Sequence, residues 1–282
     1  MIRLCAFADE SNPTLEGQID ALKRNNISLI ELRTIDGKNV FDLTKEEARE
    51  ISKTLAKNGV SVWSLGSPVG KVDIETDFKE YTKKFTTLME NAVVLGTNKI
   101  RMFSFFNAKD KSKKVYDKLS SLVKIASKYG VELYHENEKE IFGDTVENVL
   151  KLLDNVKGLK SVYDPANFIQ CGEDSLYSLK ALHSKSGYFH IKDVIKETGE
   201  LVPAGEGDGN ISKLIKDIKG DCVLTLEPHL KVFKAFSQID GTEMKNKYFF
   251  ETNEQAFDYA VSSLKKLLLK NGYKEEKGVF IK

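Results

Sequence analysis

The sequence predicts a (β/α)8 barrel, and three observations support that fold. Short apolar runs typical of strands alternate with amphipathic stretches typical of helices along the whole chain. Eight such strand–helix units fit into 282 residues, a length common for α/β barrels. No low-complexity linker divides the chain, so we expect one domain over residues 1–282.

The expected strands are short runs rich in aliphatic and aromatic residues, several of them ending in polar side chains. They cover residues 2–8, 27–33, 60–65, 99–105, 131–136, 159–164, 187–191 and 221–227.

Helix start and stop signals separate these runs. Asn12 followed by Pro13 is a favourable helix start, and Thr44/Glu47 and Asp144/Glu147 have the spacing of a capping box. The expected helices cover residues 12–26, 44–58, 78–95, 111–129, 144–155, 175–182, a stretch beginning near 211, and 254–269.

Composition excludes several classes of protein. Lys and Arg number 43 against 42 Asp and Glu, and this net charge of +1 disfavours a nucleic-acid partner. The sequence contains neither an apolar run long enough to cross a membrane nor an apolar leader, so we expect no membrane partner and a cytoplasmic location. The three cysteines are widely spaced and form no CxxC motif, which indicates reduced thiols.

Polar residues gather at the ends of the expected strands, which meet at one face of such a barrel. They are Glu31, Arg33, Arg101, Ser104, His135, Glu136, Asn137, Glu138, Asp164, Asn167, His190, Lys192, Asp193, Glu227 and His229. Three carboxylates and one imidazole from the last four strands form a plausible shell for one divalent metal ion. Strand alternation turns His135 away from Glu136.

Five motifs occur in a characteristic order. They are Glu136-Asn137, Asp164 in YDPAN, His190 in FHIKD, Gly205-Glu206-Gly207 and Glu227 in TLEPH. In this order they resemble the sugar phosphate isomerase/epimerase family with the xylose isomerase-like TIM barrel. The resemblance implies that Glu136, Asp164, His190 and Glu227 bind one metal, and that Glu136 and Glu227 also act as acid and base.

We therefore expect a metal-dependent isomerase or epimerase that moves a proton through an enediolate, acting on a ketose or related polyol ketone. Mn²⁺ is the expected metal, with Mg²⁺, Co²⁺ or Zn²⁺ as alternatives. A dehydratase of a cyclitol or sugar ketone is the alternative reaction, because the family also contains such lyases. A DNA-repair endonuclease is a weaker alternative, since the chain has four histidines and little excess positive charge. A non-catalytic binder of a polyol or a partner is a further alternative that no sequence feature favours.

Further residues are assigned to substrate contact. Asn167 stands where many epimerases of the family carry a histidine, and His229 on the Glu227 strand is a candidate replacement imidazole. Lys192 lies two residues beyond His190 and is a candidate to meet an oxyanion or anionic group. The predicted substrate-binding set is Asn167, Lys192, His229, Arg101, Trp63 and Glu31.

Two segments have alternative interpretations. The GEGDGN stretch at 205–210 resembles a phosphate cradle, but a turn before the next helix also explains it. The segment 231–253 is a candidate lid or dimer contact, and family members are often homo-oligomers.

Overall fold

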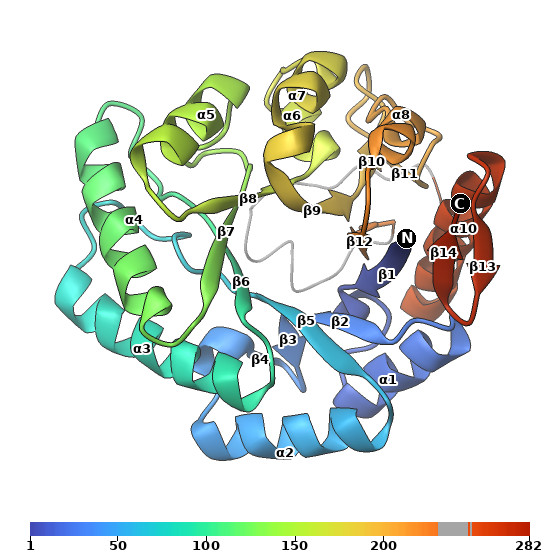
Figure 1. The fold of residues 1–282 in the computed structure, drawn as a ribbon, viewed down its shortest axis with the longest axis horizontal. Helices are drawn as coiled ribbons and strands as arrows, with labels where there is room; N and C mark the ends of the chain where they lie inside the picture. The colour runs from blue at the N-terminus through green and yellow to red at the C-terminus, as the bar shows by residue number, and fades with distance from the viewer. Residues whose placement is uncertain (231–247, 249) are drawn as a thin grey trace.

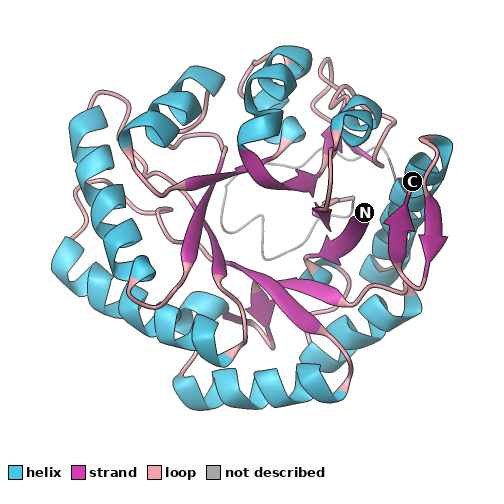
Figure 2. Ribbon diagram, in the orientation of Figure 1, coloured by secondary structure: helices cyan, strands magenta, loops and turns pink. Residues whose placement is uncertain are grey.

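The predicted closed barrel is confirmed. In this computed structural model, which describes residues 1–230, 248 and 250–282, eight parallel strands close into a ring inside a layer of helices (Figure 1, Figure 2). The barrel strands are β1 (Ile2–Ala6), β2 (Leu29–Leu32), β5 (Ser61–Gly66), β6 (Lys99–Met102), β7 (Glu132–Glu136), β8 (Lys160–Tyr163), β9 (Ser186–Ile191) and β12 (Cys222–Leu226). Each strand pairs with the next in this order, and β12 pairs with β1 to close the ring.

Helices cover the outside of the ring between successive strands. They are α1 (Leu15–Arg24), α2 (Lys45–Lys57), α3 (Phe78–Val94), α4 (Ser112–Ser127), α5 (Val146–Asn155), α6 (Pro165–Gln170), α7 (Ser175–Leu182), α8 (Ile211–Asp217) and α10 (Asn253–Lys270), with 3-10 turns η1 (Ala8–Glu10), η2 (Val40–Asp42) and η3 (His183–Lys185). Their apolar faces pack against the outward-facing residues of the strands and form the larger hydrophobic core.

Three short hairpins lie outside the repeating units. They are β3 (Thr34–Ile35) with β4 (Lys38–Asn39), β10 (Asp193–Val194) with β11 (Leu201–Val202), and β13 (Lys274–Glu276) with β14 (Val279–Ile281). β14 also pairs antiparallel with β1, so the end of the described chain joins its beginning. These hairpins were not among the predicted elements, because strands of two or three residues are too short to show the alternation of apolar and polar residues.

Helix caps explain where several elements begin. The predicted capping box of α2 is confirmed, because the Thr44 side chain accepts from the Glu47 backbone N–H and the Glu47 carboxylate accepts from the Thr44 N–H. The box predicted at Asp144 is wrong. Thr145 caps α5 by accepting from the backbone N–H of Asn148 at 3.3 Å, while Asp144 accepts a hydrogen bond from the Asn148 side chain.

Helix α6 was absent from the predicted elements, although its signal is present in the sequence. Asp164 caps it by accepting from the Asn167 backbone N–H at 3.0 Å, and Pro165 occupies the first helical turn. This cap fixes the direction of the Asp164 side chain at the end of β8.

The inside of the barrel changes character along its axis. Its lower part is a small apolar cluster of Cys5, Leu29, Tyr134, Val162, Tyr188 and Val223. Above this cluster, toward the carboxyl ends of the strands, the inward-facing residues are polar or charged and still buried. Buried charge at this end of a (β/α)8 barrel marks the place to look for a functional site.

Most of the candidate lid or dimer segment at 231–253 lies outside the described residues, so it stays a prediction. Within the described part of the chain, no helix combines the length and the apolar character needed to cross a membrane.

Gly70 gives a test of the loop above β5. Its φ of +87° is in the left-handed region, and a Cβ there would lie 2.2 Å from the backbone oxygen of Phe103, which cannot easily move. We expect Gly70→Ala to lower the free energy of unfolding by about 3 kcal/mol, measured by urea denaturation. Gly37→Ala is the control, because Gly37 has a φ of +78° and open space around it, and should lose only about 1 kcal/mol. Equal losses would contradict the proposed clash.

Candidate metal centre

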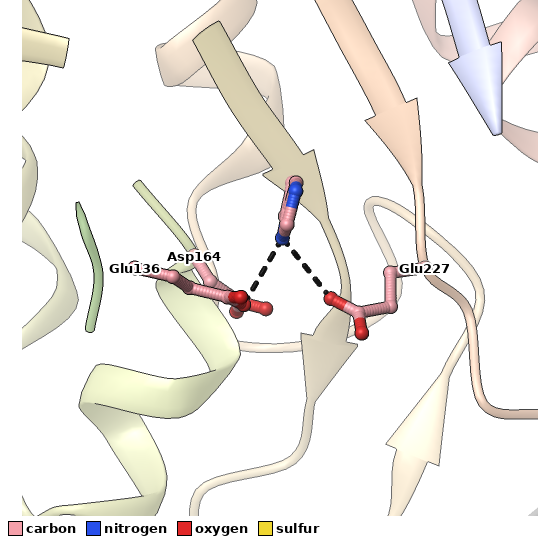
Figure 3. A group of neighbouring side chains, drawn as sticks. Glu136, Asp164 and Glu227 are labelled. Carbon is pink, nitrogen blue, oxygen red and sulfur yellow. Dashed lines mark hydrogen bonds and ion pairs between the residues drawn. The ribbon is translucent and has the colours of Figure 1, made fainter. Parts of the chain in front are cut away.

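Four predicted residues meet at the carboxyl end of the barrel. Glu136 ends β7, Asp164 follows β8, His190 lies in β9, and Glu227 follows β12. One potential ligand atom from each lies within 4.8 Å of the others, and all four residues are buried. Figure 3 shows the three carboxylates turned toward one another from different strands. The structure therefore brings together side chains separated by up to 91 positions in the sequence (227 − 136).

His190 lies between the two glutamates. Its Nδ1 is 3.0 Å from Glu136 Oε1 and 3.2 Å from Glu227 Oε2. Asp164 Oδ2 and Glu227 Oε2 are both buried; Lys192 Nζ lies 3.0 Å from the first and His190 Nδ1 lies 3.2 Å from the second. Buried carboxylates are unfavourable unless positive charge lies close to them, and a divalent ion would add such charge. Three carboxylates and one imidazole are the ligand types that Mn²⁺, Mg²⁺, Co²⁺ or Zn²⁺ accept, so the residues fit a divalent ion.

A buried arginine binds the other oxygen of each glutamate. Arg101 Nε lies 3.1 Å from Glu136 Oε2, and Arg33 Nη1 lies 3.1 Å from Glu227 Oε1. Both guanidinium groups also contact the Phe7 ring, with distances to its centroid of 4.3 Å for Arg33 and 5.3 Å for Arg101. These contacts leave Glu136 Oε1 and Glu227 Oε2 directed toward His190.

Arg33 is itself held by two acids that the sequence analysis did not assign to the site. Asp9 accepts from Arg33 at 2.8 and 3.1 Å, and Glu10 accepts at 3.3 Å. Burial raises the pKa of Asp9 above its ordinary value, although Arg33 opposes that rise. Both acids lie in the 3-10 turn directly after β1, so the rule that found the other residues at strand ends also points to them.

Lys192 adds a positive charge to the cluster. Its Nζ lies 3.0 Å from Asp164 Oδ2 and 3.9 Å from Glu227 Oε2, and only 5% of the side chain is exposed. Burial alone would favour the neutral amine, but Asp164 and Glu227 raise the pKa of Lys192 above its ordinary value. Lys192 is therefore a charged ammonium group at neutral pH.

The carboxylates respond differently to this surrounding charge. Burial raises the pKa of Asp164 to about 6, and Lys192 limits the rise. Burial also opposes ionisation of Glu227, but Lys192 and His190 outweigh it and hold the pKa of Glu227 well below its usual range. Glu227 is the more firmly ionised of the two.

Asn167 and His229 lie beside the four-residue cluster. Asn167 donates from Nδ2 to the Asn137 backbone oxygen at 2.9 Å and to Glu136 Oε1 at 3.3 Å. His229 Nε2 lies 3.1 Å from Glu10 Oε1 and 3.6 Å from Glu227 Oε1. With Lys192 and Arg101, these side chains surround the cluster, and their contact with substrate remains a prediction.

Two other residues of the predicted substrate-binding set, Trp63 and Glu31, lie deeper in the barrel than the cluster. Trp63 packs against the lower apolar cluster, where Lys99 at the start of β6 lies over its ring at 4.5 Å, so it lies toward the opposite end of the barrel. Glu31 lies beneath His190, and Tyr188, Thr225 and the imidazole engage its carboxylate. Glu31 lies one layer below Arg33, which follows two residues later and reaches Glu227. Trp63 lies lower still, beside the apolar cluster.

The glycine-rich loop at 205–210 is already occupied by a side chain of its own chain. The Asp193 carboxylate accepts from the backbone N–H groups of Gly205 at 2.8 Å, Gly207 at 3.1 Å and Gly209 at 2.8 Å. A Cβ on Gly207 would lie 2.5 Å from Asp193 Oδ1. The loop is thus a turn closed around an internal anion, and no room for a phosphate remains among these donors.

The fold and this carboxylate–imidazole cluster define a class, the (β/α)8 barrels with a potential metal centre built from their last four strands. The chain belongs to the xylose isomerase-like TIM barrel family, whose model matches residues 19–247.

Individual relatives are distant. An inosose dehydratase of Bacillus cereus (strain AH820) is 23% identical over 170 residues, covering 56% of this chain and 54% of the relative. The chain thus spans about half the length of this curated relative. Among solved structures, an IOLI protein with a bound zinc atom aligns with a TM-score of 0.73 at 19% identity, covering 95% of this chain and 99% of the other. An L-ribulose 3-epimerase aligns with a TM-score of 0.73 at 16% identity, covering 96% of each chain. These structural similarities support the fold.

His135 faces away from the cluster, as alternation predicts. Its Nε2 lies 2.9 Å from Ser104 Oγ, which also accepts from the Gly143 backbone N–H at 2.8 Å. The imidazole is fully buried, and this burial lowers its pKa from 6.5 to about 3.

This shift predicts a specific loss of stability in acid. Between pH 6.5 and 3 the unfolded chain binds a proton at His135 that the folded chain excludes, so stability falls as the pH falls. From pH 7 to pH 5 this single group should cost about 2 kcal/mol. Urea denaturation at both pH values gives the fall in the free energy of unfolding from pH 7 to pH 5. This fall should be smaller in His135→Leu than in the wild type by about 2 kcal/mol. His183→Leu, on the outer layer, is the control, and an unchanged pH dependence in His135→Leu would refute the assignment.

Proposed function

We propose that the protein is a divalent-metal-dependent isomerase or epimerase acting on a ketose or related polyol ketone. The observation that supports this most directly is the position of Glu136 and Glu227 on two sides of His190 Nδ1, at 3.0 and 3.2 Å. One carboxylate on each side of a bound ketone can remove a proton from one carbon and return a proton to the same or the neighbouring carbon.

Glu136, Asp164, His190 and Glu227 would hold the ion. A divalent ion bound there would polarise a substrate carbonyl and the neighbouring hydroxyl group. This would favour loss of the proton on the carbon that carries the hydroxyl. Mn²⁺ is our choice because carboxylate oxygens dominate the set, and Mg²⁺, Co²⁺ and Zn²⁺ are alternatives.

The remaining steps fall to the protein side chains. A carboxylate oxygen of one glutamate takes the proton from the carbon next to the carbonyl, leaving an enediolate. The other glutamate returns a proton from the opposite face for epimerisation. Return of a proton to the former carbonyl carbon, with transfer of the hydroxyl proton to the former carbonyl oxygen, gives isomerisation. Arg33 and Arg101 limit rotation of the two carboxylates, because each binds one oxygen of its partner. The ammonium group of Lys192 is well placed to stabilise negative charge on the substrate oxygens.

A metal-dependent dehydratase is the second candidate, and Lys192 favours it. In that reaction the same enolisation is followed by loss of a hydroxyl group, which requires a proton donor beside the leaving oxygen. Lys192 is a buried ammonium group within 3.9 Å of both Asp164 and Glu227. The similarity to an inosose dehydratase supports the same alternative.

The partner assignments follow from the same chemistry. We propose a small polyol ketone as substrate, and Asn167 and His229 as side chains that bind its hydroxyl groups. A homo-oligomer, a cytoplasmic location and the absence of a nucleic-acid partner stay predictions from the sequence.

Metal binding is the first test. After equilibration with Mn²⁺ and removal of free metal, mass spectrometry should find about one ion per chain, and saturation at a hundred times Kd should stabilise the fold by about 2.7 kcal/mol. The double variant His190→Ala with Glu227→Gln should lose both effects. The control is His183→Ala with Glu132→Gln, which removes the same residue types outside the cluster. Wild-type protein without metal would refute the proposed centre.

Proton transfer is the second test. In ²H₂O, turnover of a ketose should place deuterium on the carbon that exchanges its proton, and Glu136→Gln should slow this exchange by about 10² to 10⁴-fold. Glu132→Gln, on the same strand but at its start, is the control. An isomer of unchanged composition supports the first candidate, whereas a product lighter by one water supports the dehydratase. Full exchange in Glu136→Gln would contradict both.

A further inference from the structure

Glu31 is a buried carboxylate directly beneath the proposed metal centre. It lies in β2, its exposed fraction is 1%, and its side chain points into the barrel. Glu31 Oε2 is 3.2 Å from His190 Nε2 and accepts from Thr225 Oγ1 at 3.0 Å, while Oε1 accepts from the Tyr188 hydroxyl at 2.8 Å. Three groups from β9 and β12 therefore converge on one carboxylate from β2, across the inside of the barrel.

Packing alone does not explain a carboxylate at this position. The layer below Glu31 is apolar, and the inside of a (β/α)8 barrel is usually filled by branched aliphatic side chains. Moving a carboxylate out of water costs several kcal/mol even when it is paired, and apolar replacements of buried ionic groups are often no less stable. An interaction with His190 explains why a charged carboxylate occupies this position, whereas packing does not.

The two ring nitrogens of His190 face different partners. Nε2 faces Glu31, and Nδ1 faces Glu136 and Glu227. A carboxylate only accepts hydrogen bonds, and both ring nitrogens face carboxylates, so it is the direction of the ring that distinguishes them. A divalent ion among Glu136, Asp164 and Glu227 would take the lone pair of Nδ1, and Nε2 would then keep its hydrogen and donate it to Glu31. Phe7 packs edge-on against the imidazole at 5.2 Å and Tyr188 at 5.5 Å, which limits rotation of the ring.

We propose that Glu31 is a positioning residue that orients His190 and selects its Nδ1 for the divalent ion. This inference rests on the proposed function only in requiring that Glu136, Asp164, His190 and Glu227 bind a cation. Glu31 itself touches neither the ion nor the substrate. It acts through His190 by fixing the tautomer and the direction of the ring.

Co²⁺ binding to the purified chain tests this role without any substrate. Calorimetry gives the dissociation constant, and the visible absorption of Co²⁺ reports the geometry and the nitrogen ligand. We expect Glu31→Leu to bind Co²⁺ about 100-fold more weakly with a changed visible spectrum, because the imidazole loses its acceptor. Glu31→Gln should recover part of the affinity, to about 10-fold weaker than wild type, since its amide oxygen still accepts from Nε2.

Tyr188→Phe, in the layer directly below Glu31, is the matched control. It removes one donor to Glu31 and leaves the carboxylate beneath His190, so affinity and spectrum should stay close to those of wild type. Circular dichroism of the metal-free variants checks folding. If Glu31→Leu does not fold, Glu31→Gln decides, because its affinity and spectrum are both expected to differ from wild type.

The outcomes separate this inference from the proposed function. Wild type that binds Co²⁺ while the folded Glu31 variants match its affinity and spectrum would overturn the role of Glu31 and leave the metal centre intact. Wild type that binds no Co²⁺ would overturn both. If Tyr188→Phe lost as much Co²⁺ affinity as Glu31→Leu, the inference would also be overturned. Any change in packing beneath His190 would then explain the loss.

Discussion

The central constraint on this structure is the mutual repulsion of three buried carboxylates. Glu136, Asp164 and Glu227 converge on a few ångströms of space that excludes most water. Each is opposed by a separate buried cation, Arg101, Lys192 and Arg33 respectively, while His190 lies between the two glutamates. One potential ligand atom from each of the three carboxylates and from His190 lies within 4.8 Å of the others, and a divalent ion held among them would add positive charge where the carboxylates converge.

The surroundings of the cluster follow from this constraint. Arg33 forms ion pairs with Asp9 and Glu10 as well as with Glu227, so the turn after β1 is part of the site. Phe7 packs against both guanidinium groups and, edge-on, against the imidazole, so one aromatic ring contacts three of the charged or polar side chains of the site. Rigid support of this kind keeps a metal centre within narrow geometric limits. The polar upper part of the barrel is thus one connected network on an apolar base.

The proteins similar to this chain carry out more than one kind of reaction, since one is named a dehydratase and another an epimerase. The side chains directly beside the four-residue cluster include Lys192, Asn167 and His229. Lys192 Nζ lies 3.0 Å from Asp164, Asn167 Nδ2 lies 3.3 Å from Glu136, and His229 Nε2 lies 3.6 Å from Glu227.

The sequence by itself determined the barrel and the outward direction of His135, because strand period and helix caps are local signals. The strand-end rule gave a longer list of polar residues, and the family resemblance singled out the four residues of the cluster from it. Only the tertiary structure decided that Arg33 meets Glu227, 194 positions away, that Glu31 supports His190, and that Asp193 fills the glycine loop. The depth of Trp63 within the barrel also depended on it. These contacts depend on the register in which the strands close, and no single segment contains that information.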